Sequence, residues 1–319
     1  MTILQSLVPL VRIGTRGSPL AMMQARLVAK LLRQHHGLSE TEIAVLPIST
    51  GGDRSQKSNA SLSEIGGKGL FTKEIDAAML GGQIDIAVHS SKDVATVLPE
   101  GIVMPVYLER EDARDAFISL RFRTVQELPR GAKFGTSSIR RAAQVLRLRP
   151  DLEIVPFRGN VDTRLQKLAD GVADATMLAV SGLNRLEKMD RITAILDVEN
   201  FMPAPAQGAI GIATRHGDAK AQDLIAPLNH APTHSAIIAE RAMLAVLDGS
   251  CRTPVGAWSQ LENDQIELRG EILSLDGQQH FAAQASGPVD AAETLGAALG
   301  QRLLQSAGTA FVAQWASAP

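Results

Sequence analysis

The sequence contains a single cysteine among its 319 residues, and aromatic side chains make up only 3% of it. One cysteine can form no disulfide within the chain and cannot supply a zinc site built from several thiolates. The seven histidines are scattered, without the HExxH spacing of a metal-binding helix, so we expect no metal site. Few aromatic rings also leave little surface on which single-stranded bases could stack.

Long hydrophobic runs are absent as well. No stretch approaches the roughly 18 consecutive apolar residues that a membrane-spanning helix requires. Residues 1–12 carry no basic leader and no clear small-residue cleavage site, and we therefore expect a cytoplasmic protein. The glycines of residues 66–69 do not have the GxxxxGK[ST] spacing, and no Ser or Thr follows them at the required place, which argues against a nucleotide-binding phosphate loop.

The net charge of −2 is unevenly distributed along the chain. Residues 121–191 contain 14 Lys and Arg against 8 Asp and Glu, which leaves 18 against 26 in the rest. A basic middle within a neutral protein favours a localised anion site over a general affinity for nucleic acid. A solvated basic face is the simpler explanation, and only the placement of these residues along the predicted elements argues against it.

Short apolar strand candidates alternate with helical patterns through most of the chain, which predicts α/β layers with largely parallel sheets. A strand over residues 11–15 precedes a helix that Ser18 caps, that has Pro19 in its first turn and that Gly37 ends. A polar segment rich in Gly and Ser follows over residues 50–69. A connection of this length is usually functional or mobile.

One arrangement of elements occurs twice. A helix over residues 70–80 precedes a buried strand over 84–88, and a helix over 161–169 precedes a strand over 175–178. An aspartate opens the strand in both copies, and a serine follows it. This weak internal echo predicts two related lobes, one on each side of about residue 110.

The chain after Gly249 has a different character. Residues 266–275 alternate between apolar and polar as a half-buried strand does, and residues 291–304 form a long helical pattern rich in Ala and Leu. We therefore expect a small third domain of the α+β class, with Cys251 at its entrance.

Basic residues follow several predicted strands at the point where each strand ends. After Gly135, hydroxyl residues cap a helix that has two arginines in its first turn, where they oppose the helix dipole unless an anion is bound. The carboxyl ends of strands line one cleft in open α/β sheets, and Arg suits planar carboxylates. In the alternative, both arginines point to solvent or pair with acids elsewhere. The same pattern surrounds Arg16, Arg158, Arg164 and Arg185.

Two further residues could carry chemistry. Asp93 follows a buried strand among several cations, where a carboxylate stays ionised and could stabilise a cationic intermediate or exchange protons. Cys251 precedes Arg252, and a neighbouring cation favours the reactive thiolate. In the simpler interpretations Asp93 only shapes a turn, His89 is a satisfied buried histidine, and Cys251 is an inert small hydrophobe.

Eight segments, in order and spread over nearly the whole chain, together closely resemble the porphobilinogen deaminase family, also called hydroxymethylbilane synthases. They are residues 15–21, 66–71, 85–93, 109–117, 135–141, 158–164, 203–211 and 249–256. The resemblance implies two lobes like those of type II periplasmic binding proteins, with a C-terminal domain that carries the reactive cysteine. It places the first lobe at residues 1–109 and 209–228, the second at 110–208 and 229–247, and the C-terminal domain at 248–319.

The resemblance also implies an activity. The enzyme would be a transferase of tetrapyrrole biosynthesis that deaminates four porphobilinogen molecules, joins them head to tail and releases hydroxymethylbilane. Growth would start on a dipyrromethane cofactor held through a thioether at Cys251, with Asp93 as the catalytic residue. The expected partner is porphobilinogen alone, without nucleic acid or membrane, and the expected state is a monomer.

The positions of this sequence that match cofactor-binding or substrate-binding positions of the family are mostly basic or hydroxyl residues, as the acetate and propionate groups of the pyrroles would require. They are Arg16, Ser18, Lys68, Phe71, Ser90, Lys92, Thr136, Ser137, Ser138, Arg140, Arg141, Arg158, Arg164, Arg185 and Gln207. Three positions depart from the family's usual pattern: Glu64 stands where lysine is common, Ala95 where proline often follows the Asp-Val pair, and Ala206 where glycine is frequent.

Two readings from other classes stay open on the sequence. A cytoplasmic anion-binding or sensor protein could use the same two-lobed clamp without catalysis, and it would need neither Cys251 nor Asp93. A nucleic-acid-binding protein would show binding that weakens steeply with salt and no preference for pyrrole carboxylates.

Overall fold

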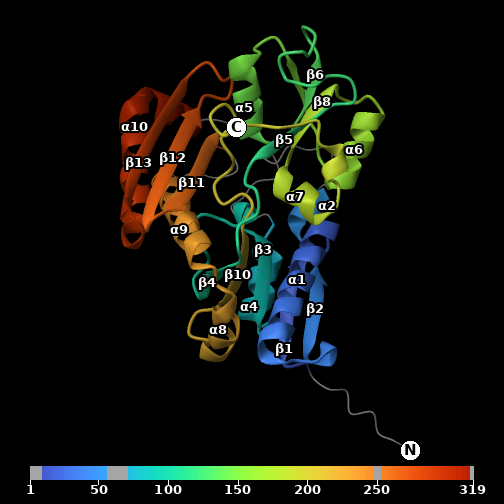
Figure 1. The fold of residues 1–319 in the computed structure, drawn as a ribbon, viewed down its shortest axis with the longest axis vertical. Coiled ribbons are helices and arrows are strands. Elements are labelled where there is room, and N and C mark those ends of the chain that lie inside the picture. The colour runs from blue at the N-terminus through green and yellow to red at the C-terminus, as the bar shows by residue number, and fades with distance from the viewer. Residues whose placement is uncertain (1–8, 56–70, 248–252, 317–319) are drawn as a thin grey trace, which may run out of the picture.

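The computed structural model describes residues 9–55, 71–247 and 253–316. Figure 1 shows two lobes stacked along the long axis of the molecule, with a third sheet-and-helix unit beside the upper one. The predicted class, α/β with two sheet-containing lobes and a small C-terminal α+β domain, is confirmed. Within the described ranges, none of the helices combines the length and the apolar character needed to cross a membrane.

The first lobe is built on a mixed five-stranded sheet in the order β2-β1-β3-β10-β4. Strands β1 and β3 run parallel, whereas β10 runs antiparallel to both of its neighbours, β3 and β4. A strand from late in the sequence therefore completes a sheet that the N-terminal region begins. The bounds are β1 Val11–Arg16, β2 Ile43–Ile48, β3 Ile86–Ser90, β4 Ile102–Tyr107 and β10 Ile210–Arg215.

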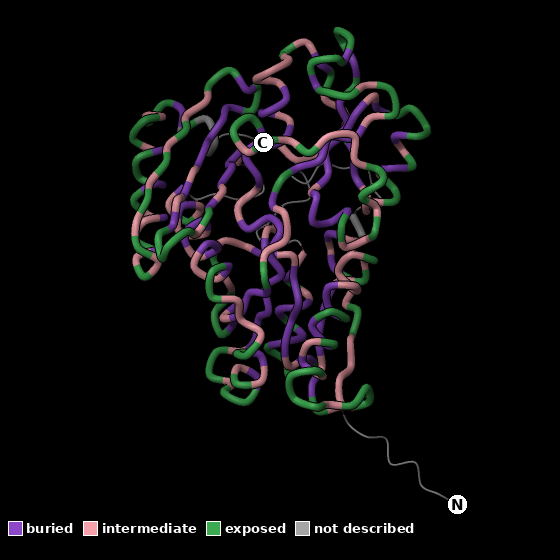
Figure 2. The backbone as a smooth tube through the Cα atoms, in the orientation of Figure 1, coloured by how far each residue is buried: buried purple, intermediate pink, exposed green. Residues whose placement is uncertain are grey.

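Helices cover both faces of this sheet. Helix α1, Pro19–His36, is capped at Ser18, whose hydroxyl accepts the Ala21 N–H, and it ends at Gly37 with φ 68°. The sequence predicted each of these features. Val28 and Leu32 of α1 are fully buried and pack against the strands, which Figure 2 shows as largely buried. The other helices are α2 Gly51–Ser55, α4 Lys73–Leu80 and α8 Ala219–Ile225.

The second lobe has a sheet of the same size, in the order β7-β6-β8-β5-β9. Strand β6 is parallel to β7 and β8, and β5 is antiparallel to β8 and β9. The strands are β5 Asp115–Ile118, β6 Lys133–Gly135, β7 Glu153–Val155, β8 Ala175–Ala179 and β9 Ala194–Ile195. The helices are α5 Ile139–Leu148, α6 Val161–Ala169 and α7 Val180–Arg185.

The internal echo corresponds to equivalent contacts in the two lobes. The Asp85 carboxylate accepts the Arg12 N–H at 2.8 Å, and the Asp174 carboxylate accepts the Lys133 N–H at the same distance. In both lobes this aspartate directly precedes the central strand of the sheet, and it accepts a backbone N–H from the beginning of the neighbouring parallel strand. Each also forms an ion pair with an arginine, Arg12 or Arg121.

The chain passes twice between the two lobes. It leaves the first sheet after β4, enters the second at β5, and returns between β9 and β10. The two connecting segments, residues 108–114 and 196–209, lie together: Glu111 N–H donates to the Gly208 carbonyl at 3.3 Å. The strand-end residues of both lobes are therefore brought to the same region.

The third unit is an antiparallel sheet, β11-β12-β13, covered by two helices. Its elements are β11 Val255–Glu262, β12 Gln265–Leu273, β13 His280–Pro288, α9 Ala231–Val246 and α10 Ala292–Ala316. The sequence placed residues 229–247 in the second lobe, but α9 packs here instead. Its Ala239 and Met243 lie in the same apolar cluster as the strands. Gly296 of α10 explains the close fit, because a Cβ there would lie 2.1 Å from the Ala239 carbonyl oxygen.

Candidate active site

Arg16 and Asp93 meet at the carboxyl end of the first sheet. Arg16 ends β1, and Asp93 lies in the short 3₁₀ helix Ser91–Asp93 that follows β3. An Nη of Arg16 lies 3.7 Å from an Asp93 carboxylate oxygen, and the guanidinium stacks over the Phe71 ring at 4.3 Å. The Asp93 side chain is 37% exposed, so it can meet a bound molecule.

A second carboxylate holds Arg16 more tightly than Asp93 does. Asp53 in α2 accepts N–H groups from Arg16 Nε at 3.1 Å and Nη2 at 2.5 Å. Its other oxygen accepts the Thr50 hydroxyl at 2.7 Å. The pKa of Asp53 is lowered because the hydrogen bonds from Arg16 and Thr50 outweigh the opposing effect of burial. Asp53 thus fixes the direction of Arg16, and the contact of Arg16 with Asp93 is the longer of the two.

These side chains line a small hollow in the first lobe. Its wall includes Arg16, Ser18, Phe71, Ser90 and Asp93. His89 belongs to the same wall, and burial, with a smaller contribution from Arg16, lowers its pKa to about 4 even though Asp93 opposes the shift. His89 is therefore neutral at physiological pH, as a satisfied buried histidine would be.

Ser90 is held by a residue that the sequence did not single out. The Gln24 amide, on α1, donates to the Ser90 hydroxyl at 3.0 Å and can accept from it at 3.1 Å. Gln24 is almost fully buried. This contact ties the end of β3 to the helix that starts after Arg16.

In the second lobe the predicted hydroxyl residues organise the backbone. Ser138 caps α5 by accepting the Arg141 N–H, and Thr136 accepts the Ser138 N–H at 3.1 Å. Ser137 accepts the Phe157 N–H at 3.0 Å, which joins the ends of β6 and β7. All three hydroxyls therefore have a structural partner on the strand-end side of the sheet.

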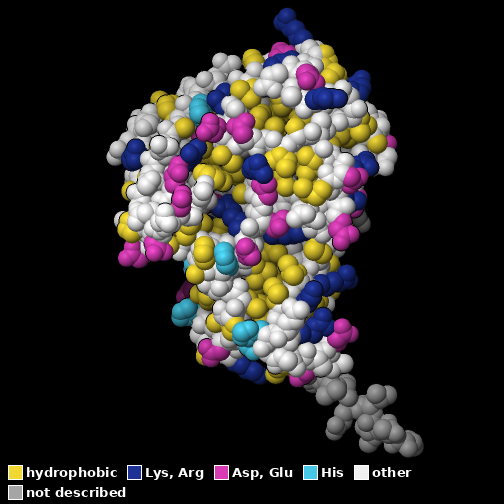
Figure 3. Space-filling view, viewed as in Figure 1, with side chains coloured by type: hydrophobic (Ala, Val, Ile, Leu, Met, Phe, Trp, Pro, Cys, Tyr) yellow, Lys and Arg dark blue, Asp and Glu magenta, His cyan; other side chains and the backbone are white. Residues whose placement is uncertain are grey.

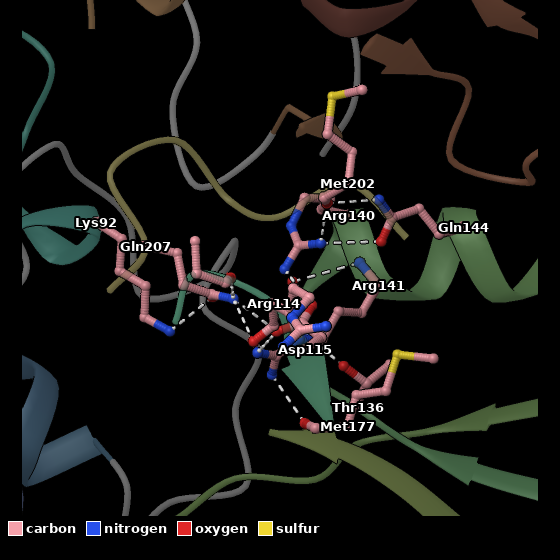
Figure 4. A network of polar contacts seen from close by, with 12 residues as sticks. Lys92, Arg114, Asp115, Thr136, Arg140, Arg141, Gln144, Met177, Met202 and Gln207 are labelled. Atoms are coloured by element: carbon pink, nitrogen blue, oxygen red, sulfur yellow. Dashed lines mark hydrogen bonds and ion pairs between the residues drawn. The ribbon is translucent and has the colours of Figure 1, made fainter. Parts of the chain in front are cut away.

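Arg140 and Arg141 pair with an acid of the chain itself. The Asp115 carboxylate, fully buried at the start of β5, accepts from Arg140 Nη2 at 2.8 Å and from Arg141 Nη2 at 2.7 Å and Nε at 3.1 Å (Figure 4). Both arginines are buried as well. Burial alone would raise the pKa of Asp115, but the two guanidinium groups hold it well below its usual range. The sequence had left such a pairing open as the alternative to anion binding.

Arg164 on α6 has unused hydrogen-bonding capacity. Its Nε is buried and has no hydrogen-bond partner among the residues that the structure describes. Burial and the charge of Arg141 lower the pKa of Arg164 to about 10, with a further contribution from Arg158, while Asp93 opposes the shift. Asp93 of the first lobe thus faces a cluster of cations on the second.

Lys92 and Arg185 reach the segments that connect the lobes. Lys92 Nζ donates to the Gln207 side-chain oxygen at 3.0 Å, and Arg185 Nη2 donates to the Gly208 carbonyl at 2.7 Å. Burial is the main cause that lowers the pKa of Lys92 to about 8, and the charge of Arg141 adds to it. Gln207 is fully buried, and in this structure its side chain connects Lys92 after β3 to the segment that contains Ala113.

The distribution of surface charge and the grouping of possible metal ligands were both subjects of the sequence-based predictions. On the face shown in Figure 3, basic and acidic side chains are interspersed, without a continuous basic stripe. Among the described residues, no three His, Cys, Asp or Glu side chains are grouped so that they could hold a metal ion.

Comparison with known proteins decides between the readings. The family model described as "Porphobilinogen deaminase, dipyromethane cofactor binding domain" matches residues 11–223, and the one for the C-terminal domain of that enzyme matches residues 234–305. The porphobilinogen deaminase of Nitrobacter hamburgensis is 48% identical over 309 residues, 97% of both chains. The chain belongs to the porphobilinogen deaminase family. The predicted enzyme class, its role in tetrapyrrole biosynthesis and its dipyrromethane cofactor are thereby confirmed.

Solved structures of periplasmic binding proteins are also similar to this porphobilinogen deaminase family member. A periplasmic substrate-binding protein of an ABC transporter from Coxiella burnetii has 15% identity and a TM-score of 0.44, over 70% of this chain and 93% of its own. A putative methionine-binding lipoprotein from Bacillus subtilis has 12% identity and a TM-score of 0.41, over 69% and 90%.

The structure brings together most of the site residues that the sequence predicted, around the strand ends of both lobes. Two of them, Lys68 and Cys251, lie outside the described residues, as does Glu64. The sequence missed Asp53 and Asp115, which hold the predicted arginines. Asp115 lies inside one of the segments that resemble the family, 109–117, and opens the strand β5, and its place there is the one signal that the sequence offers.

Proposed function

We propose that the cations at the strand ends bind the pyrrole carboxylates of the cofactor and of the growing chain, and that Asp93 acts on the reacting pyrroles. One observation carries this proposal: Arg164 is mostly buried, beside Arg141 and Asp93, and its Nε has no hydrogen-bond partner among the residues described. A buried cation without a full set of partners is unfavourable, and a bound carboxylate relieves it. Arginine is suited to this because it contacts a carboxylate through two parallel N–H groups.

The chemistry of the donors fits the dipyrromethane cofactor. Arg158 and Arg164 supply guanidinium groups, and Lys92 an ammonium, on the two sides of one region. In this proposal these residues hold the acetate and propionate groups of the cofactor, with Arg185 as a further cation. The cofactor, when bound through Cys251, supplies the pyrrole carbon at which the chain grows.

Asp93 is the residue we propose as catalytic. Its carboxylate is partly exposed in the hollow, 3.7 Å from Arg16, so its oxygens can accept hydrogen bonds from pyrrole N–H groups. An ionised acceptor at this place stabilises positive charge that develops on a pyrrole nitrogen, and it can take up or return a proton. Ser18, Ser90 and Phe71 of the same wall would orient the ring, with Lys68 as a further cation.

Four statements remain predictions. The protein is predicted to be cytoplasmic and monomeric. We also propose the lobe boundaries given by the resemblance, with α9 transferred to the C-terminal unit because it packs there. The attachment of the cofactor at Cys251 is predicted from the resemblance.

The test is the intact mass of the denatured protein, compared with that of a Cys251→Ser variant. We expect a covalent excess of two pyrrole units in the wild type and its loss in the variant. After addition of porphobilinogen, the wild type should show further one-pyrrole increments, and an Asp93→Asn variant with its cofactor in place should not. An Asp290→Asn variant, remote in sequence and exposed on the short helix before α10, is the control and should behave as the wild type.

A wild type that carries no adduct and gains none on incubation with porphobilinogen would contradict the proposed roles. Normal increments in the Asp93→Asn variant would contradict the role of Asp93 alone.

A further inference from the structure

Asp115 has an unusual number of partners for a residue that no ligand can reach. It is fully buried at the start of β5, directly after the first segment that connects the lobes. Its two oxygens accept N–H groups from Arg140, from Arg141 twice, and from the Gln207 amide at 2.8 Å. Three side chains of the proposed binding set are therefore oriented by one carboxylate (Figure 4).

The same carboxylate acts on the first lobe through Gln207. The Gln207 amide nitrogen donates to Asp115 and to the Ala113 carbonyl at 2.6 Å, which leaves its oxygen pointing the other way. That oxygen accepts the Lys92 ammonium at 3.0 Å. Because an amide has its donor and acceptor on opposite sides, fixing the nitrogen on Asp115 fixes the acceptor that Lys92 meets.

Charge explains why a carboxylate is needed at this position. Arg140 and Arg141 are neighbours in sequence, are both buried, and both bond the same group. Two buried guanidinium groups that bond the same carboxylate are close enough to repel each other, and the negative charge of that carboxylate offsets the repulsion. In the described part of the chain Arg140 Nε is buried without a partner, whereas each nitrogen of Arg141 has one, with Nη1 donating to the Met177 carbonyl at 2.8 Å.

We propose that Asp115 is a positioning residue for the anion site: it sets the directions in which Arg140, Arg141 and, through Gln207, Lys92 present their remaining N–H groups to pyrrole carboxylates. This inference rests on the proposed function. Asp115 does not itself contact the substrate. It acts in the substrate-free protein, so that the site is formed before a carboxylate arrives and little side-chain ordering remains for binding to complete.

The decisive variant is Asp115→Glu, which keeps the buried charge and moves the carboxylate by one methylene. We expect the KM for porphobilinogen to rise about tenfold or more, with kcat changed less than about threefold, because carboxylate binding is displaced while Asp93 is untouched. We also expect the intact mass of the purified protein to show a smaller fraction with the two-pyrrole adduct. This second readout does not depend on turnover.

Asp151→Asn is the matched control. Asp151 also receives two N–H groups from one arginine, Arg149, at 2.8 and 2.7 Å, in the same lobe, but it lies at the far end of α5 from Arg140 and Arg141. We expect its KM and its adduct fraction to equal those of the wild type. A purely structural Asp115 would lower the melting temperature and the yield of active protein, while the folded fraction kept the wild-type KM.

A second variant, Gln207→Met, removes the amide's bonds to Asp115, to the Ala113 carbonyl and to Lys92, and leaves the buried charge of Asp115 with its two arginines. We expect the KM of this variant for porphobilinogen to rise threefold or more. If Asp115→Glu does not fold, the result for Gln207→Met alone tests the positioning role. Wild-type KM and wild-type adduct fraction in the variants that fold would overturn the inference. A wild type that never forms pyrrole adducts would instead contradict the proposed function, so the two failures are distinguishable.

Discussion

Ala206 has a left-handed backbone, with φ 62°, at a position where the family often has glycine. For a residue with a Cβ this conformation is unfavourable by roughly 1–2 kcal/mol. The structure offsets the strain with a buried hydrogen bond, in which the Ala206 N–H donates to Glu240 at 2.7 Å. Its methyl group also packs in the core of the first lobe.

An Ala206→Gly substitution should therefore change the free energy of unfolding little. Relief of the strain is opposed by the lost burial of one methyl, about 0.8 kcal/mol, and by the greater backbone entropy of glycine, roughly 0.5–1 kcal/mol. Ala209→Gly is the control, because Ala209 is equally buried but has no positive φ. We expect the control to lose about 1–2 kcal/mol more in urea denaturation. Equal losses in both variants would show that the backbone at Ala206 is not strained.

At this scale the sequence predicted the types of site residue better than their partners. Arg140, Arg141 and Gln207 were identified as contacts in the cleft, but the acid that they share, Asp115, is 25 residues or more from each of them in sequence. Such pairings depend on how the strands are ordered in space. Local patterns along the chain do not contain that information, so Asp53 and Asp115 could not be derived from them.

Among the elements, local signals predicted boundaries well where capping chemistry is strong. The helix over 161–169 was predicted with its observed bounds, and Asn160 caps it by accepting the Thr163 N–H at 2.9 Å. The strand predicted over 84–88 is shifted by two residues, to Ile86–Ser90. A continuous apolar run does not mark where pairing starts, and the partner strands decide it. The packing of α9 was missed for the same reason, since its partners come later in the chain.

The β12–β13 hairpin meets α5 at a glycine. Gly277 has φ 72°, and a Cβ there would lie 2.4 Å from the Ala143 carbonyl oxygen and 2.5 Å from the Arg147 nitrogen. Backbone atoms inside a helix cannot move aside cheaply. The close approach also lets Glu271 accept the Gln144 amide at 2.6 Å, which links the C-terminal sheet to the helix of Arg140 and Arg141.

A Gly277→Ala variant should therefore be destabilised by about 3 kcal/mol or more, through backbone strain and a direct clash together. Gly131→Ala is the matched control, because Gly131 has φ 74° and open space around its Cβ position. We expect the control to lose only about 1 kcal/mol, the cost of the left-handed conformation. Thermal unfolding of both variants measures the difference, and similar losses would show that the hairpin can move away from α5.

The stability of the whole molecule should fall in mild acid because of His89. Its pKa is about 4 in the folded protein, against roughly 6.5 in an unfolded chain. Between these values the unfolded state binds more protons, so stability rises with pH, and it is lost as the pH falls from about 6.5 toward 4. At pH 5 the loss from this residue is about 2 kcal/mol, at 1.36 kcal/mol for each pH unit.

Urea denaturation at pH 7 and pH 5 tests this. A His89→Gln variant cannot take up the proton, so the decrease between the two pH values should be smaller than in the wild type by about 2 kcal/mol. His35→Gln, at the exposed end of α1, is the control and should keep the decrease of the wild type. The comparison uses the change with pH, so a uniform loss of stability in either variant does not affect it. An unchanged decrease in His89→Gln would mean that His89 is accessible to protons in the folded state.

The position of β10 in the first sheet has a consequence for biosynthesis of the chain. This strand, residues 210–215, lies between β3 and β4, so the first sheet stays in two unjoined parts until the ribosome has passed it. The second sheet is complete within residues 115–195, which emerge earlier. Domains fold as units once their residues are available, and long-range strand pairing is slow. The lobe that begins first is therefore the later one to finish folding, and the exposed edges of β3 and β4 are where a nascent chain would most need a chaperone.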